Sequence, residues 1–252
     1  MTESVLLPTR RDEAWRYSDM DAIAGSEPGR FEAWEDINVS EGKTHRQCLV
    51  LHGDADFELR RFRVKLGERA RCEMFAVNAG GTLGRVEVVV TAARGSHFEF
   101  GGVTLGGGDT TREFVTRMAH ERPEATSKQT VRSVHWGRGT GNFLGRIDVA
   151  RDAQKTDAAQ SFKGLLLEKG ASANTVPQLE IYADDVKCAH GATVGRLDEA
   201  ARYYMASRGI PPELSQRLLV QAFIGDAFVA LDDEEERARL MNAALSTLET
   251  RT

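Results

Sequence analysis

The sequence predicts a mainly β core with helical segments at both ends, and three observations lead to this fold class. Short runs rich in Val, Phe, Ile and Leu recur between residues 47 and 182, separated by turn residues. The intervals between these runs are too short for the helical crossovers that an α/β sheet requires. After Gly195 the apolar residues recur at helical spacing instead.

Length and composition bound the class of protein before any motif is considered. The chain has 252 residues, and its 33 Lys and Arg residues against 38 Asp and Glu residues give a net charge of −5. This composition excludes a disordered, collagen-like or coiled-coil chain, and the mild acidity argues against nucleic-acid binding as the main task. Three cysteines, Cys48, Cys72 and Cys188, form no Cys-x-x-Cys pair, which argues against a disulfide framework and a structural zinc site.

The N-terminal region mixes aromatic and charged residues. The spacing of apolar residues from Thr9 to Ile23, including Trp15, predicts a short amphipathic helix that Gly25 and Pro28 close. No stretch near the start has the apolar run of a signal peptide, and no later run approaches the ~20 apolar residues of a spanning helix. We therefore expect a soluble cytoplasmic protein without a membrane partner.

The middle of the chain is interpreted as β structure throughout. The predicted strands are 48–52, 57–66, 86–90, 97–100, 113–118, 130–136, 143–149, 162–167 and 179–182. Successive runs begin about 11 to 19 residues apart, which suits a β-solenoid or a sandwich with long loops, and the spacing leaves both open.

Glycine is unusually frequent, with 24 residues. Gly80 and Gly81, the run 106–108, and Gly137, Gly139 and Gly141 are interpreted as turn residues. None of these stretches forms a phosphate-binding loop, because Gly-x-x-x-x-Gly-Lys-Ser/Thr does not occur. If ATP takes part in the function, another chain must bind it.

Two helices follow the β region. Leu197 to Gly209 forms the first, with Asp198 as N-cap and Gly209 as the residue that ends it. A second helix opens at Pro211 and reaches about Leu231.

A third helix completes the C-terminal region. It starts at the capping-box pair Asp233 and Glu236, and its apolar residues are Met241, Ala244, Leu245 and Leu248. The apolar stripes of these helices must be covered by the core or by a partner.

Two neighbourhoods hold both histidine and cysteine. His45, Cys48 and His52 could share a metal only on a helix, and the apolar sequence around Cys48 indicates a strand, so we disfavour that site. Cys188 and His190 point the same way on an extended chain, about 7 Å apart along the strand.

A thiolate and an imidazole on one face suit zinc, iron or copper. An extended chain from residue 179 to 190 would add Glu180, Tyr182 and Asp184 to the face of Cys188. Further ligands would have to come from Asp184, Asp185, a neighbouring strand or another chain. The competing interpretation is a buried structural cysteine beside a hydrogen-bonded histidine.

The segment PQLEIYADDVKCAHGATVGRLDEAARYYMASRGI, residues 177–210, closely resembles the SufD members of the SufB/SufD family, subunits of the SUF iron–sulfur cluster assembly machinery. Residues 153–171 and 7–19 are similar to two further SufD segments. Members of the SufB type carry a cysteine where this chain has Ala171 and a glutamate where it has Gly191. Both differences favour the SufD type.

The resemblance implies a mainly β fold: a right-handed parallel β-helix core with an N-terminal helical segment and a C-terminal helical region. The corresponding domain boundaries are 1–40, 41–195 and 196–252. It implies a non-catalytic scaffold that pairs with a SufB-like subunit and binds a SufC-like ABC ATPase, with a homodimer as the alternative in isolation. No cofactor is expected on the chain alone, and iron or an Fe–S cluster would be shared transiently with SufB.

The resemblance also assigns roles to residues. His190 matches a histidine implicated in cluster assembly at the SufB–SufD interface, and Cys188 is a weaker candidate beside it. The residues expected to face the ATPase are Tyr203, Tyr204, Ser207, Arg208 and Gly209. Two other functions stay open: a stand-alone metal-binding enzyme built on Cys188 and His190, and a carbohydrate-active β-helix enzyme, which needs acidic residues and a basic residue along one face.

Overall fold

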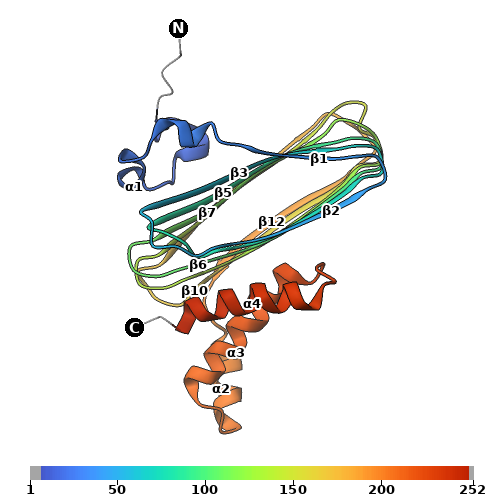
Figure 1. The fold of residues 1–252 in the computed structure, drawn as a ribbon. Helices are drawn as coiled ribbons and strands as arrows, with labels where there is room; N and C mark the ends of the chain where they lie inside the picture. Colours follow the sequence, from blue (N-terminus) through green and yellow to red (C-terminus); the bar gives the residue numbers. More distant parts are fainter. Residues whose placement is uncertain (1–6, 250–252) are drawn as a thin grey trace.

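The computed structural model describes residues 7–249 and contains a flattened parallel β-helix of about six turns (Figure 1). Strands alternate between two facing six-stranded sheets, in the orders β1-β3-β5-β7-β9-β11 and β12-β10-β8-β6-β4-β2. We call the first sheet A and the second sheet B. The strands are β1 Glu35–Val39, β2 Thr44–Leu51, β3 Phe57–Leu66, β4 Arg71–Asn78, β5 Leu83–Ala92, β6 His97–Gly106, β7 Thr111–His120, β8 Thr126–His135, β9 Thr140–Val149, β10 Asp157–Leu166, β11 Ser172–Ile181 and β12 Lys187–Gly195.

The structure decides between a solenoid and a sandwich, because every strand pair is parallel. All nine predicted strands are confirmed, although most extend beyond the predicted ends. The sequence interpretation missed β1 and β4, and it placed the residues of β12 in a single extended run with those of β11.

The main core lies between the two sheets, where side chains of alternate positions meet. Phe62, Val88, Phe114 and Phe143 are at most 1% exposed there. Burying a side chain of this size stabilises the fold by about 1.5–3 kcal/mol, so each coil holds its neighbours in register.

One corner of the solenoid carries a left-handed residue in each of the first five coils. These residues are Gly42, Arg69, Gly95, Glu124 and Lys155, with φ between 54° and 65°. In each case the backbone N–H donates to a carbonyl of the next coil, as from Lys155 to Asp185 at 2.6 Å. Three of the five are not glycine, so the sequence did not reveal this repeat.

Glycine serves two purposes in the fold. At Gly81, φ is +70° in a turn, as predicted. Gly141 was predicted to be a turn residue, but it lies within β9, where a Cβ atom would be 2.1 Å from the Ser133 hydroxyl. Inside the solenoid glycine therefore makes room for large or polar neighbours, a role that spacing in the sequence does not show.

The N-terminal residues pack on the outer face of sheet A. The predicted helix from Thr9 to Ile23 is wrong, because the segment breaks into short turns of helix: η1 Glu13–Trp15, α1 Met20–Ala24 and η2 Pro28–Phe31. Trp15, Phe31 and Phe57 form an aromatic cluster with ring centroids 5.5–6.4 Å apart. Tertiary packing of these rings outweighs the weak helical preference of so short a segment.

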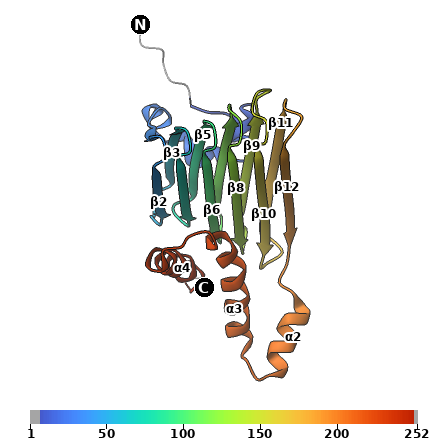
Figure 2. The same cartoon turned by 90° about the vertical axis from the view of Figure 1, so that its right-hand side faces the viewer.

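The C-terminal helices lie on the side of sheet B (Figure 2). They are α2 Glu199–Ser207, α3 Pro212–Gly225, η3 Asp226–Phe228 and α4 Glu234–Glu249. Asp198 caps α2, Gly209 has φ +78°, and Asp233 accepts from the Glu236 N–H, as predicted. The predicted second helix is too long, since α3 ends at Gly225 and a 3₁₀ turn follows.

Helix α4 crosses the outer face of sheet B and buries Leu240, Ala244 and Leu245 against its strands and α3. The core therefore covers most of the apolar stripe of α4. Regions 1–40 and 196–252 also include residues 1–6 and 250–252, which lie outside the described part. Across residues 7–249, no helix is both long and apolar enough to cross a membrane.

Candidate functional site

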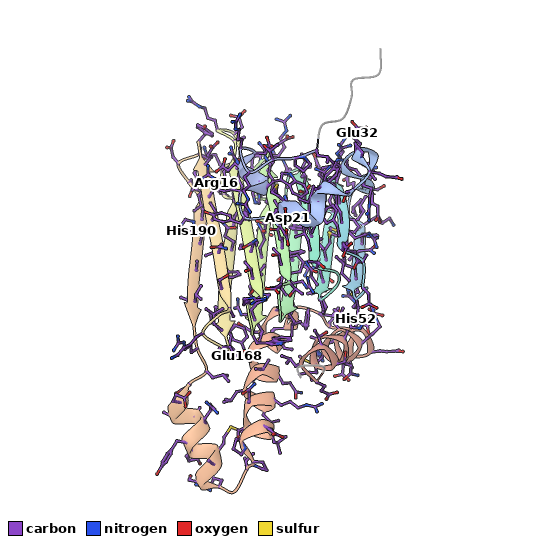
Figure 3. The ribbon with its side chains drawn as sticks, turned by 90° about the vertical axis from the view of Figure 1, so that its left-hand side faces the viewer. Arg16, Asp21, Glu32, His52, Glu168 and His190 are labelled. Carbon is purple, nitrogen blue, oxygen red and sulfur yellow. The ribbon has the colours of Figure 1, made fainter. Side chains whose placement is uncertain are left out.

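The candidate residues lie at the end of the solenoid that β11 and β12 form. Strand β11 pairs only with β9, and β12 pairs only with β10, so each has one free edge. His190 is exposed on β12, opposite Gln160 of β10, and Cys188 lies opposite Ala158. Figure 3 shows His190 on the outermost strand, well away from His52 at the other end.

Cys188 and His190 share one face of β12, as predicted. The half-buried Cys188 packs against the core between the sheets, so this face points toward the interior of the solenoid. His190 is nevertheless exposed, because no further coil covers it. The single extended run from 179 to 190 is wrong: β11 ends at Ile181 and the chain turns before β12, so Glu180 and Asp184 do not continue the face of Cys188.

All three cysteines are held as neutral thiols. Burial raises the pKa of Cys188, and the negative charge of Asp157 raises it further. Burial raises the pKa of Cys48 to about 11 and that of Cys72 to about 12. Because the thiolate is the nucleophile and metal ligand, none of these sulfurs is activated within the chain itself.

Neither predicted histidine and cysteine neighbourhood forms a complete metal site. Within the described residues, no three His, Cys, Asp or Glu side chains converge on one point. Cys188 and His190 contribute at most two donors, and a tetrahedral site needs four. His45 and Cys48 lie on strand β2 with opposite parity, which confirms the extended interpretation of that segment.

Apolar side chains surround the same open end. Ile181 is 39% exposed, Tyr182 is 64% exposed, and Val194 is 46% exposed. A free strand edge flanked by exposed apolar side chains is a surface that invites pairing with another chain. Sequence reasoning did not identify these residues as an exposed apolar surface, because only the strand order places them at the end of the solenoid.

The residues predicted to face an ATPase gather at the far end of the helical region. Tyr203 is 79% exposed and Tyr204 is 59% exposed on α2. The Arg208 guanidinium stacks over the Tyr204 ring at 5.1 Å, and the Ser207 hydroxyl donates to the Tyr204 carbonyl at 2.7 Å. Helix α2 lies at the far end of the helical region from the solenoid (Figure 2), and these four residues and Gly209 lie on it or directly after it.

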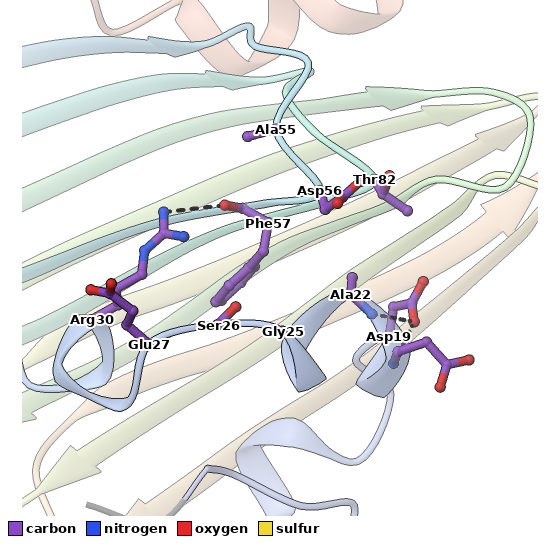
Figure 4. A pocket seen from close by; sticks show the side chains of 11 residues that line it. Asp19, Ala22, Gly25, Ser26, Glu27, Arg30, Ala55, Asp56, Phe57 and Thr82 are labelled. Carbon is purple, nitrogen blue, oxygen red and sulfur yellow. Dashed lines mark hydrogen bonds between the residues drawn. The ribbon is translucent and has the colours of Figure 1, made fainter.

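A hollow lies elsewhere, between the N-terminal segment and the loop before β3 (Figure 4). It has a volume of about 780 Å³ and is lined by Asp19, Asp21, Glu27, Asp56 and Arg30 among others. Asp19 caps α1 through the Asp21 and Ala22 N–H groups, and Arg30 donates to the Phe57 carbonyl at 3.2 Å. Asp19 and Arg30 thus have local structural roles in this part of the chain.

Comparison with known proteins identifies relatives of the whole core. Residues 39–223 match the family described as "SUF system FeS cluster assembly, SufBD core domain". The iron–sulfur cluster assembly protein SufD of Escherichia coli (strain K12) is 43% identical over 119 residues, which are 47% of this chain and 28% of that protein. SufD of Bacillus subtilis is 31% identical over 140 residues, 56% of this chain and 32% of that protein.

A third relative aligns over more of the chain. The iron–sulfur cluster assembly SufBD family protein of Synechocystis is 30% identical over 184 residues, which are 73% of this chain and 40% of that protein. The matched segments thus cover less than half the length of each of these three relatives.

Proposed function

The chain belongs to the SufBD family of SUF-system iron–sulfur cluster assembly proteins, and we propose that it acts as a SufD-like, non-catalytic scaffold subunit. In this proposal the β11–β12 end pairs with a SufB-like subunit, and the nascent cluster is cargo held at the joint. ATP hydrolysis would take place on a SufC-like partner.

The observation that carries the proposal is the exposed His190 at an unpaired solenoid end. An imidazole at this position supplies one nitrogen ligand to a site that the partner must complete. Its neighbour Cys188 is a neutral, half-buried thiol, so the partner must provide thiolate ligands. The division of ligands between two chains explains why neither candidate residue belongs to a complete site here.

The second surface of the proposed scaffold is the tip of the C-terminal helical region. Tyr203, Tyr204, Ser207, Arg208 and Gly209 present aromatic area and a guanidinium, which are common at protein interfaces. We propose that the SufC-like ATPase docks there. Without a SufB-like subunit, the free β11–β12 edges would pair with a second copy of this chain.

The test of the proposal compares His190→Ala with a matched control, His52→Ala. Both histidines are exposed, but His52 lies at the opposite end of the solenoid. Clusters are formed by the complex reconstituted with SufB-like and SufC-like proteins. For His190→Ala, cluster formation should fall at least about tenfold, the loss typical of replacing a residue that holds or orients a metal ligand. His52→Ala should assemble clusters at the normal rate.

Two results would contradict the proposal. Full cluster formation by His190→Ala would remove this residue from the site. Failure of the chain to bind a SufB-like subunit from the same organism, measured by size-exclusion chromatography with light scattering, would refute the scaffold role itself.

A further inference from the structure

One layer of the core between the sheets changes from apolar to polar along the solenoid. The inward-facing register partners of sheet B in this layer, from β4 to β12, are Met74, Phe100, Gln129, Gln160 and His190. The corresponding partners of sheet A, from β5 to β11, are Val88, Thr116, Gly145 and Pro177. The last three coils therefore replace large apolar side chains with polar or small ones, up to the open end. We call Thr116, Gln129, Gln160 and His190 the polar layer.

The inner members of the polar layer are buried but incompletely hydrogen-bonded. Thr116, Gln129 and Gln160 are at most 3% exposed. Within the described residues, four of their atoms have no hydrogen-bond partner: Thr116 Oγ1, Gln129 Nε2, Gln129 Oε1 and Gln160 Oε1. Burying a polar atom costs the full free energy of removing it from water unless a new partner replaces the water. These side chains therefore require a partner that the chain itself does not supply.

The unpartnered atoms gather around Gly145. Thr116 is the register partner of Gly145 on the neighbouring strand. Gln160 crosses the core from sheet B, so that a Cβ atom on Gly145 would lie 2.1 Å from Gln160 Oε1. Gln160 Nε2 donates to the Gly145 carbonyl at 3.2 Å, which leaves Oε1 as the free acceptor of this amide. Gln129 lies beside Gln160 on β8. Water both donates and accepts, so it satisfies such a mixed set of donors and acceptors.

His190 is the outermost member of the polar layer and the register partner of Gln160. Neighbouring strands lie about 4.8 Å apart, which is within the reach of two hydrogen bonds through one water molecule, about 5.6 Å. Among residues 7–249, no side chain or backbone group hydrogen-bonds to the His190 ring. A histidine that binds a metal through one ring nitrogen almost always donates the N–H of the other to an acceptor. Water bound to Gln160 Oε1 is such an acceptor.

We propose that the polar layer binds water between Thr116, Gln129 and Gln160, and that this water accepts the N–H of the His190 imidazole. The inference rests on the proposed function of His190 and specifies how its ring is oriented. With the inner nitrogen protonated, the outer nitrogen keeps its lone pair for iron, and His190 is held in one neutral tautomer. Gln129 and Gln160 are positioning residues, because they act on the metal only through His190.

The water site is tested on the isolated chain, independently of any partner. A crystal structure that resolves ordered water should show at least one water molecule within hydrogen-bond distance of both Gln160 Oε1 and the Gln129 amide. A direct hydrogen bond between the two amides, or their packing without water, would overturn the site. Gln129→Met keeps the length of the side chain and removes its polar atoms, so its structure should lack this water.

The effect on His190 is tested by nitrogen NMR of its imidazole in the isolated chain. One neutral tautomer should exceed the other by at least about fivefold more than in free imidazole, the preference that one hydrogen bond confers. Gln129→Met should reduce this preference. Gln47→Met is the matched control, since Gln47 faces the same layer in the first coil, separated from Gln129 by Met74 and Phe100. An unchanged tautomer ratio in Gln129→Met would refute the positioning role.

Cluster formation separates this inference from the proposed function. In the complex reconstituted with SufB-like and SufC-like proteins, Gln129→Met should lower cluster formation about tenfold, as for other residues that orient a metal ligand. Gln47→Met should assemble clusters normally. Normal assembly by Gln129→Met, with loss of assembly by His190→Ala, would refute the positioning role and leave the proposed function intact. Normal assembly by His190→Ala would refute the proposed function, whereas the water site would still be decided by the structure of the isolated chain.

Discussion

Replacement of Arg85 by methionine tests the buried charge network that Arg85 forms with Glu87 and Glu113. The Arg85 side chain is 0% exposed, 2.5 Å from Glu87 and 2.6 Å from Glu113, and its guanidinium lies 3.7 Å above the Trp15 ring. Methionine keeps much of the volume but leaves the buried carboxylate of Glu113 without its cation, whereas Glu87 keeps its ion pair with Arg61. Losing one partner of such a buried set costs about 3–5 kcal/mol.

The assay for Arg85→Met is urea unfolding at pH 7, followed by far-UV circular dichroism and tryptophan fluorescence. With a slope of about 3 kcal/mol per molar urea, the midpoint should fall by about 1–1.7 M. Fluorescence of Trp15 should change first, because the ring loses its stacked cation.

The control for this experiment is Arg138→Met. Arg138 and Asp109 form an ion pair at a surface turn, with both side chains mostly exposed, so its removal should leave the midpoint unchanged. A shift for Arg85→Met smaller than about 0.3 M would mean that the network contributes no more than a surface pair. That result would refute the reasoning about buried charge.

Three further predictions concern other parts of the molecule. Gly145→Ala should destabilise the fold by about 1–3 kcal/mol, since a Cβ atom there would lie 2.1 Å from Gln160 Oε1, whereas Gly191→Ala, with no atom within 4 Å, should leave the melting temperature unchanged. Burial lowers the pKa of His135 to about 3, so its contribution to stability is full above pH 6.5 and is lost at about 1.4 kcal/mol per pH unit as the pH falls toward 3. Replacing His135 by glutamine should remove this dependence on pH from the urea midpoints. An unchanged pH dependence would contradict the prediction. Tyr203→Ala should lower affinity for the SufC-like ATPase in a pull-down without changing the melting temperature, because this side chain is 79% exposed; normal affinity would place the docking surface elsewhere.

Much of the local structure could be predicted because its causes are local. Val and Phe runs bounded by turn residues identified nine strands, and Asp198, Gly209 and the pair Asp233 and Glu236 marked helix ends correctly. Alternation along one strand also placed Cys188 and His190 on one face. These features depend on residues a few positions apart, so the sequence alone determined them.

The features that only the tertiary structure decided depend on contacts between residues one coil or more apart in the sequence. Side-chain hydrogen bonds between neighbouring strands of sheet A join residues 28 to 32 positions apart: Arg85 with Glu113, Glu113 with Asn142, and Asn142 with Asn174. Glu13 accepts a hydrogen bond from Gln178 across 165 positions. No periodicity in the sequence reports such pairings, because the register of parallel strands is set by packing between the sheets. The N-terminal helix prediction was wrong for the same reason, since its aromatic residues pack on sheet A.

The sequence by itself thus determined a β core with helical ends and a cysteine and a histidine on one strand face. Tertiary structure decided that this strand is the last of its sheet, which leaves His190 exposed and beside a free strand edge. Whether an inward-facing residue is covered depends on the number of coils beyond it, and that number is a property of the whole solenoid.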